Sequence, residues 1–222
     1  MPDYCRDVSR LPTISVITPV HPARIHSGLF AECLQSIHAQ TLLPDAHCVA
    51  IDVDSQGAAP TRQRALMMAK TDWVAMLDSD DLFKPRHLRQ MLTCALEREA
   101  DFVYSWFNIL QDFGGGQRRV LEEDPIFPMG HYLNPWDPEH PIETTITTFV
   151  RTELAQSVGF QALDRGHDQN SGEDFAFTLS CQAAGAKIEH LVRKTWLWRH
   201  HSINGKIMNT SGRPTRGDAV SE

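Results

Sequence analysis

A short apolar run that ends in a cluster of acids constrains the fold of this chain more than any other stretch. Residues 73–77 are apolar and bounded by charge. Three carboxylates follow within four positions, at Asp78, Asp80 and Asp81. The run predicts a buried strand. The acids then lie at the carboxyl end of that strand, where open α/β sheets bind their ligands.

Two explanations account for the acidic cluster. Carboxylates this close repel one another, and a hard divalent cation with oxygen ligands would offset the repulsion and carry phosphates with it. Alternatively, the cluster is a solvated turn before a helix, where aspartate favours the helix dipole.

Strands and helices alternate through the first half of the chain. Short β-branched or apolar runs predict strands at 13–19, 46–53, 73–77 and 101–107. The segments between them predict helices at 29–40, 57–70 and 85–99. This alternation predicts a parallel, doubly wound α/β sheet with right-handed crossovers.

The second half departs from the alternation. Three glycines at 114–116 predict a hairpin turn between 107–112 and 117–121. Further extended segments are expected at 146–150 and 187–198, and helices at 151–158 and 173–184. A long loop over 122–143 lacks periodicity, and such loops in compact domains are usually functional. Its Trp136, Tyr132 and His131 are candidates for a binding surface, unless they only pack the loop.

The composition excludes several classes of protein. The chain has 222 residues, 41% of them hydrophobic, enough for one large α/β domain. A net charge of -7 argues against broad nucleic-acid binding. Neither a signal peptide nor an apolar run of about 18 residues is present, so we expect no integral membrane segment. Five scattered cysteines without a CxxC pair indicate reduced thiols in a cytoplasmic protein.

Several blocks in the same order resemble the family-2 glycosyltransferases. They are 14–19, 33–37 with Gln40, 61–66, 77–81 with Pro85, 159–160, 172–174 and 198–201. The resemblance implies a single GT-A (Rossmann-like) domain with a mostly parallel central sheet, flanking helices and an acceptor-side loop region. It divides the domain into a nucleotide-sugar-binding half at 1–110, an acceptor-binding and catalytic-base half at 111–205, and a mobile tail at 206–222.

The resemblance also implies an activity. The family transfers one sugar from a nucleoside-diphosphate sugar to a carbohydrate or other hydroxyl acceptor, with inversion and with Mn²⁺ or Mg²⁺. A metal neutralises the charge that develops on the diphosphate. A UDP-sugar is the favoured donor and a GDP-sugar the alternative. The Gln-x-x-Arg-Trp motif of processive members is absent after Asp174, which favours a non-processive enzyme.

The acidic loop matches the DxD motif of the family. Asp80 matches the last Asp, a metal ligand, and Asp78 the first, with Ser79 between them in the donor site. Asp81 is expected beside the metal ligands or as a helix cap. His201 matches a histidine that completes the metal site, with His200 as the adjacent candidate and a structural histidine as the other interpretation. Neutral imidazole suits Mn²⁺ better than Mg²⁺.

Other matches concern the nucleotide. Pro19 and Val20 match the strand end whose backbone meets the base. Arg62 matches an arginine near the nucleotide, unless it is a surface helix residue. Asp52 matches the first acid of a uracil-binding Asp-Asp-Gly-Ser segment. The paired acid and the glycine are lost here, and Asp54 would substitute.

The base that activates the acceptor matches a second acidic pair. Asp174 matches the catalytic base, which takes the proton of the acceptor hydroxyl. Glu173 would be a positioning neighbour. A carboxylate at the start of a helix is alternatively a contact with the helix dipole.

Two other functions remain open. A haloacid-dehalogenase-like phosphatase would use Asp78 as its nucleophile, but that family usually carries the motif on its first strand and follows it with Gly-Thr. A catalytically silent nucleotide- or sugar-binding module would need no base, so Asp174 argues against it.

Overall fold

The computed structural model describes residues 10–122, 133–141, 144–160, 172–203 and 206–208, the last segment and 201–203 by their backbone alone. The strands are β1 (Ile14–Val20), β2 (Ala46–Ile51), β3 (Trp73–Met76), β4 (Leu82–Phe83), β5 (Phe102–Gly114), β6 (Gln117–Leu121), β7 (Thr148–Arg151), β8 (Ile188–Ile203) and β9 (Lys206–Met208). The helices are the 3₁₀ turn η1 (Pro22–Arg24), α1 (Gly28–His38), α2 (Ala58–Met68), α3 (His87–Glu97), α5 (Thr152–Val158) and α6 (Glu173–Ala183).

These strands form one sheet in the order β2-β1-β3-β7-β5-β8-β4, with β6 paired to β5 and β9 to β8. Strands β1, β2, β3, β5 and β8 run in one direction, and β7 and β4 run against them. The expected α/β class with a mostly parallel central sheet is therefore confirmed.

Helices cover both faces of the sheet, because successive strand residues point to opposite sides. On one face, α1 and α3 pack against residues such as Val16, Ala75 and Val103. On the other face, α2, α5 and α6 pack against alternate residues such as Ile17 and Val74. This burial on both faces explains why β1 and β3 are almost continuously buried, whereas the edge strand β2 alternates between buried and more exposed residues.

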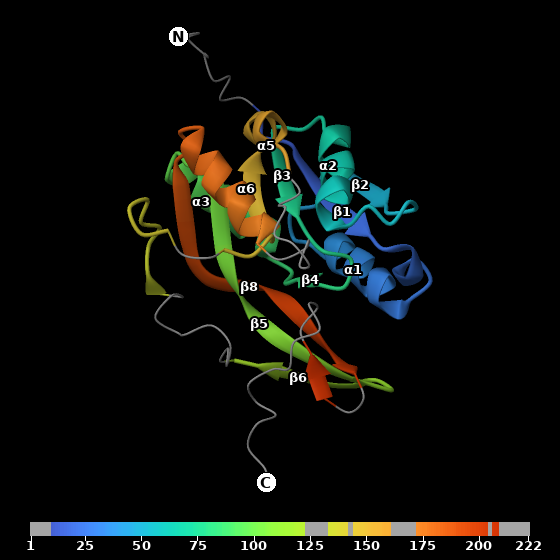
Figure 1. The fold of residues 1–222 in the computed structure, drawn as a ribbon. Helices are drawn as coiled ribbons and strands as arrows, with labels where there is room; N and C mark the ends of the chain where they lie inside the picture. Colours follow the sequence, from blue (N-terminus) through green and yellow to red (C-terminus); the bar gives the residue numbers. More distant parts are fainter. Residues whose placement is uncertain (1–9, 123–132, 142–143, 161–171, 204–205, 209–222) are drawn as a thin grey trace.

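Two long strands carry the sheet beyond the helices. Figure 1 shows β5 and β8 running side by side from the helix-covered part of the molecule toward the β6 hairpin. The predicted glycine turn is confirmed, since Gly114, Gly115 and Gly116 all have positive φ, a conformation that a side chain would strain. The hairpin lies on the same side of the molecule as α1, which places it near the acidic loop.

The pairing of strands that are distant in the sequence differs from the expected parallel, doubly wound sheet. The fourth strand of the alternating series, β5, does not pair with β3, because β7 lies antiparallel between them. The two-residue strand β4 was not expected, and it forms only by pairing with β8. β5 also crosses the expected boundary between 110 and 111. Residues 206–208 of the expected tail form β9, and 209–222 lie outside the described residues.

Within the described ranges, every helix falls short of the length and apolar character needed to cross a membrane.

Candidate active site

The acidic loop follows β3 directly and lies where the ends of β1 and β3 meet the first turn of α6. Leu77 still donates its backbone N–H to Ile17 at 3.1 Å, and the chain leaves the sheet at Asp78. The Asp78 side chain is 27% exposed, whereas the Asp80 side chain is 1% exposed. The loop therefore presents its first acid to solvent and buries the last ones.

Arg62 joins two acidic segments that are far apart in the sequence. Its Nη2 donates to both carboxylate oxygens of Asp78, at 2.8 and 2.9 Å. Its Nη1 pairs with Oε1 of Glu173, in the first turn of α6. The guanidinium is buried, so Arg62 is not a surface helix residue. The structure thus brings the predicted donor loop and the predicted base segment together.

The charges around Arg62 are unequal. Burial raises the pKa of Glu173, Arg62 opposes the rise, and the charges of Asp174 and Asp78 add to it. Asp174 follows in the same turn of α6, half-buried, and its carbonyl accepts from the Thr178 hydroxyl at 3.1 Å. Although burial opposes it, the charges of Asp78, Glu173 and Asp174 all act on the one guanidinium of Arg62 and raise its pKa.

Arg24 pairs with the second acid of the DxD motif. Its Nη1 lies 2.7 Å from Oδ1 of Asp80. The Arg24 side chain is 31% exposed and comes from η1, which follows β1 after one residue. Asp80 is thus almost closed off from solvent, with a guanidinium against its carboxylate.

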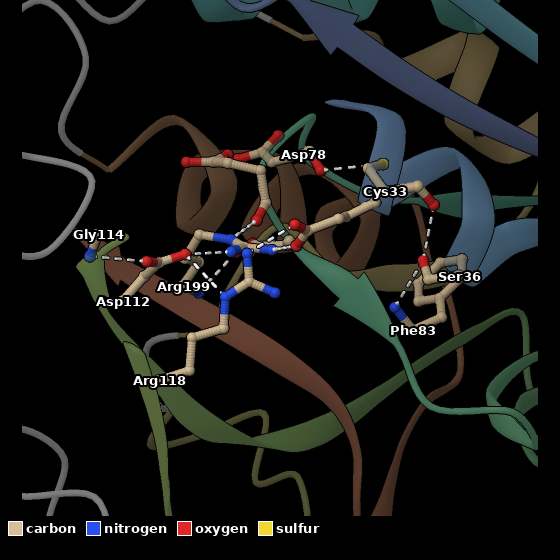
Figure 2. Close-up of polar contacts among 11 residues, drawn as sticks. Cys33, Ser36, Asp78, Phe83, Asp112, Gly114, Arg118 and Arg199 are labelled. Carbon is tan, nitrogen blue, oxygen red and sulfur yellow. Dashed lines mark hydrogen bonds and ion pairs between the residues drawn. The ribbon is translucent and has the colours of Figure 1, made fainter. Parts of the chain in front are cut away.

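Arg199 of β8 holds the acidic loop by contacts with Asp80 and Asp81. It is fully buried on β8. Its Nε donates to the carbonyl of Asp80 at 2.7 Å, and its backbone N–H donates to Oδ1 of Asp81 at 2.9 Å. Its two remaining nitrogens donate to Asp112 and Glu32, each at 2.6 Å (Figure 2).

A second arginine closes this buried network. Arg118 of the β6 hairpin donates to Glu32 at 2.6 Å and to Asp112 at 3.2 Å. Burial opposes the ionisation of Glu32, but the hydrogen bonds of Arg118 and Arg199 hold its pKa below the usual value. The Asp81 carboxyl is compensated less. Burial, with the charges of Asp80 and Asp78, raises its pKa well above the usual value, and the backbone N–H and charge of Arg199 oppose this only in part.

The predicted nucleotide residues lie on two neighbouring strands. Val20 ends β1, and its carbonyl accepts the N–H of Asp52 at 2.9 Å, while Pro19 precedes it and is half-buried. The Asp52 carboxylate accepts the backbone N–H groups of Gln56 at 2.8 Å and Gly57 at 2.9 Å. Burial opposes its ionisation, yet these bonds lower its pKa.

Asp52 thereby organises the turn that begins α2. Both of its oxygens are engaged by the chain, and a contact with the base remains a prediction. Asp54 is exposed, and Ser79 is buried within the acidic loop. The uracil-binding role expected for Asp54 and the donor-site role expected for Ser79 both remain predictions.

The histidine candidates are separated by the structure. The His200 side chain is fully buried and lies edge-on against Trp198, with ring centroids 4.7 Å apart. The backbone of His201 continues β8, and its side chain lies outside the described atoms. Trp136 packs edge-on against Tyr104, so it belongs partly to the core. Tyr132 and His131 lie outside the described residues.

A divalent cation fits the chemistry of this loop. Carboxylate oxygens such as those of Asp78 and Asp80 are the donors that Mg²⁺ and Mn²⁺ prefer. The described residues contain no group of three or more His, Cys, Asp or Glu side chains arranged to hold a metal ion. Asp78 and Asp80 would therefore need a further ligand, for which His201 is the candidate from sequence.

Sequence reasoning missed the residues that hold the loop. Arg199 belonged to a recognised block but had no role, and Arg24 was a loop residue. Glu32 and Asp112 were not singled out. One sequence signal was available. Asp112 and Arg199 are charged residues that follow apolar stretches of β5 and β8, where a charge is unexpected unless it is paired.

Comparison with solved structures finds the same fold in TarS of S. aureus. The chain matches TarS 1–349 in complex with UDP-GlcNAc with a TM-score of 0.59 and 18% identity, over 87% of this chain and 60% of that one. The complex of TarS 1–349 with UDP gives 0.57 and 17%, over 84% and 60%. A longer TarS chain gives 0.59 and 17%, over 83% and 36%.

The chain thus spans 36 to 60% of the TarS chains that it matches. A search of curated protein sequences gives no match. The family profile described as "Glycosyl transferase family 2" matches residues 46–159, a segment that contains β2, the acidic loop, β5 and β7. That segment is more than half of the chain, and the protein belongs to glycosyl transferase family 2.

Proposed function

We propose that the protein is a metal-dependent, inverting and non-processive glycosyltransferase. It moves one sugar from a nucleoside-diphosphate sugar to a hydroxyl acceptor. The observation that carries the proposal is the bridge of Arg62 between Asp78 and Glu173, which are 16 and 111 positions away from it. A donor loop and a base segment are held together by one buried guanidinium.

The two acidic segments have separate tasks in this proposal. Asp78 and Asp80 hold a divalent cation, with His201 as a further ligand. The bound cation would supply positive charge to the departing diphosphate. Asp174 takes the proton of the acceptor hydroxyl as the new bond forms. Glu173 fixes the start of α6 through Arg62, so that Asp174 faces the donor.

A uridine diphosphate sugar is the proposed donor. TarS structures that share this fold contain UDP or UDP-GlcNAc. In this chain the backbone at Pro19 and Val20, with Asp52 and Asp54 beside it, provides the edge on which a base would lie. The donor half at 1–110 would bind the nucleotide, and 111–205 the acceptor.

A thermal-shift experiment tests the donor. Purified protein is heated with UDP, GDP, dTDP or CDP, each with and without Mn²⁺. A ligand present at about 100 times its Kd stabilises the folded state by about 2.7 kcal/mol, which moves Tm by degrees. We expect a shift with UDP that requires Mn²⁺. If none of the four nucleotides shifts Tm, the result contradicts the proposal and favours a phosphatase or a catalytically silent binding module.

The base is tested by Asp174→Asn. The amide cannot take a proton, so we expect kcat to fall by about 10²- to 10⁴-fold. UDP affinity should stay within about twofold, because the substitution leaves the Arg62 bridge in place. Glu97→Gln, at the exposed end of α3, is the matched control and should leave both quantities unchanged. A variant of Asp174 with full rate would show the assignment to be wrong.

A further inference from the structure

We propose that Arg24 is an exchangeable counter-ion. It neutralises Asp80 while the donor site is empty and moves to the diphosphate when a divalent cation binds Asp80. This inference rests on the proposed function and assigns a specific role to a residue of that site.

Each acid of the cluster has an arginine partner. Arg62 binds the carboxylate of Asp78, Arg24 pairs with that of Asp80, and the backbone N–H of Arg199 donates to that of Asp81. Three carboxylates within four residues repel one another, and these contacts offset that repulsion in the folded chain.

Arg24 differs from the other two arginines in how it is held. The side chains of Arg62 and Arg199 are 7% and 0% exposed. Arg62 also contacts Glu173, and Arg199 also contacts Asp112 and Glu32. The side chain of Arg24 is 31% exposed. It stands on η1, a turn of three residues, none of which is buried. Its departure would break few other contacts, whereas departure of Arg62 or Arg199 would leave buried acids behind.

The position of Arg24 also sets up competition. Its Nη1 lies 2.7 Å from Oδ1 of a carboxylate that is 1% exposed. A cation reaches that oxygen only after the guanidinium withdraws, because two positive groups cannot share one oxygen at contact distance without strong repulsion. A cation bound at Oδ1 therefore competes directly with Arg24, and one bound at the other oxygen of Asp80 is still repelled by the nearby guanidinium.

The released guanidinium has a suitable destination. η1 follows the end of β1, the strand end assigned to the nucleotide. The planar fork of arginine matches phosphate oxygens with two parallel hydrogen bonds. Arg24 then keeps one ionic contact in both states, and the exchange costs less than the loss of an ion pair.

The first measurement is Mn²⁺ binding to nucleotide-free protein, followed by the electron paramagnetic resonance signal of free Mn²⁺. Arg24→Gln removes the competitor, and we expect it to bind Mn²⁺ about tenfold more tightly than wild type. Arg98→Gln is the matched control. It breaks an exposed pair with Glu189 on β8, which lies beside the start of β5, at the end of these strands far from the acidic loop. It should leave Mn²⁺ affinity unchanged.

The second measurement is UDP binding by calorimetry at saturating Mn²⁺. Arg24→Gln should bind UDP about tenfold more weakly than wild type, and Arg24→Lys should lose less, since lysine keeps the charge without the fork. In an Asp80→Asn background, Arg24→Gln should no longer affect Mn²⁺ binding. The two effects of opposite sign, tighter metal and weaker nucleotide, distinguish exchange from general damage.

The outcomes separate this inference from the proposed function. Equal Mn²⁺ affinity of wild type and Arg24→Gln, including no measurable binding by either, overturns the counter-ion role. Equally tight UDP binding by wild type with and without Mn²⁺ also overturns the counter-ion role, because UDP binding would then not depend on release of Arg24 by the metal. A wild type that binds no nucleoside diphosphate refutes the proposed donor site, while tighter Mn²⁺ binding by Arg24→Gln would still support the competition at Asp80.

Discussion

Arg199 and Arg62 are both buried arginines that contact the acidic loop after β3, but the charges around them differ. Around Arg199, two arginines face the two acids Glu32 and Asp112, and the pKa of each acid is lowered although burial opposes it. Around Arg62, one arginine faces Asp78, Glu173 and Asp174, and the pKa of Glu173 is raised, first by burial.

This difference indicates that the Arg199 cluster supports the loop structurally, whereas the Arg62 cluster is the candidate for ligand binding. The balanced cluster under the loop satisfies its charges internally and contacts the backbone of Asp80, so it fixes geometry and needs no ligand. The cluster around Arg62 brings three acids to one arginine, and the pKa of Glu173 is raised there. Nearby acids of this kind raise one another's pKa, and we expect a bound cation to oppose that effect.

The largest effect is expected from removal of the scaffold arginine. Arg199→Met should destabilise the fold by about 3–5 kcal/mol, because it leaves Asp112 and Glu32 with the partly exposed Arg118 alone and removes the donor to the Asp80 carbonyl. Urea unfolding at neutral pH measures the loss. The control is Arg118→Gln, whose side chain is 38% exposed; its cost should stay below about 1 kcal/mol. Equal costs for the two variants would refute the view that Arg199 contributes more to the cluster than Arg118.

A smaller effect on stability is expected at the site. Arg62→Met should cost about 1–3 kcal/mol, since Asp78 can regain water and Glu173 can take up a proton. The same variant should lose UDP binding, measured by calorimetry with Mn²⁺, whereas a folded Arg199 variant would retain part of it. A loss of stability as large as that of Arg199→Met would show that the two clusters do not differ.

The smallest effect is a difference in pH dependence. Stability is compared between wild type and Glu32→Gln, and between wild type and Glu173→Gln, from pH 4 to 8 by urea unfolding. The lowered pKa of Glu32 gives wild type an advantage above the unfolded pKa of about 4.3, and this advantage is lost as the pH falls. The raised pKa of Glu173 gives an advantage below about 4.3 that is lost as the pH rises through the folded pKa.

The two differences should therefore have opposite slopes, each below about 1.4 kcal/mol per pH unit. Glu97→Gln, exposed on α3, is the control for the loss of one acidic side chain. Slopes of the same sign would show that Glu173 is stabilised as a carboxylate, and the contrast between the clusters would fail.

Much of the fold follows from local sequence. The apolar runs and the helical spacing predicted β1 to β3 with α1 and α2 between them, since each element is specified by its own periodicity. The insertion of β7 between β3 and β5 was not predictable in this way. Strand partners depend on contacts between distant residues, and β7 shows the same apolar pattern as a parallel neighbour would.

The site was predictable to a similar extent. The sequence placed Arg62, Asp78 and Glu173 in one site, and the structure brings these three together. It did not indicate Arg24 or Arg199, because nothing near them in the chain shows which acids they meet. Arg199 lies 167 positions from Glu32, and only the folded sheet reveals the pair.

That separation has a consequence for the order of events on the ribosome. Glu32, the acidic loop and Asp112 are all synthesised before β8, so a nascent chain of this length carries the acids without the arginine that they surround. The acidic loop therefore reaches its final form only when β8 joins β5 and β4. A contact so distant in sequence is slow to form, which makes the completion of this network a late step in folding.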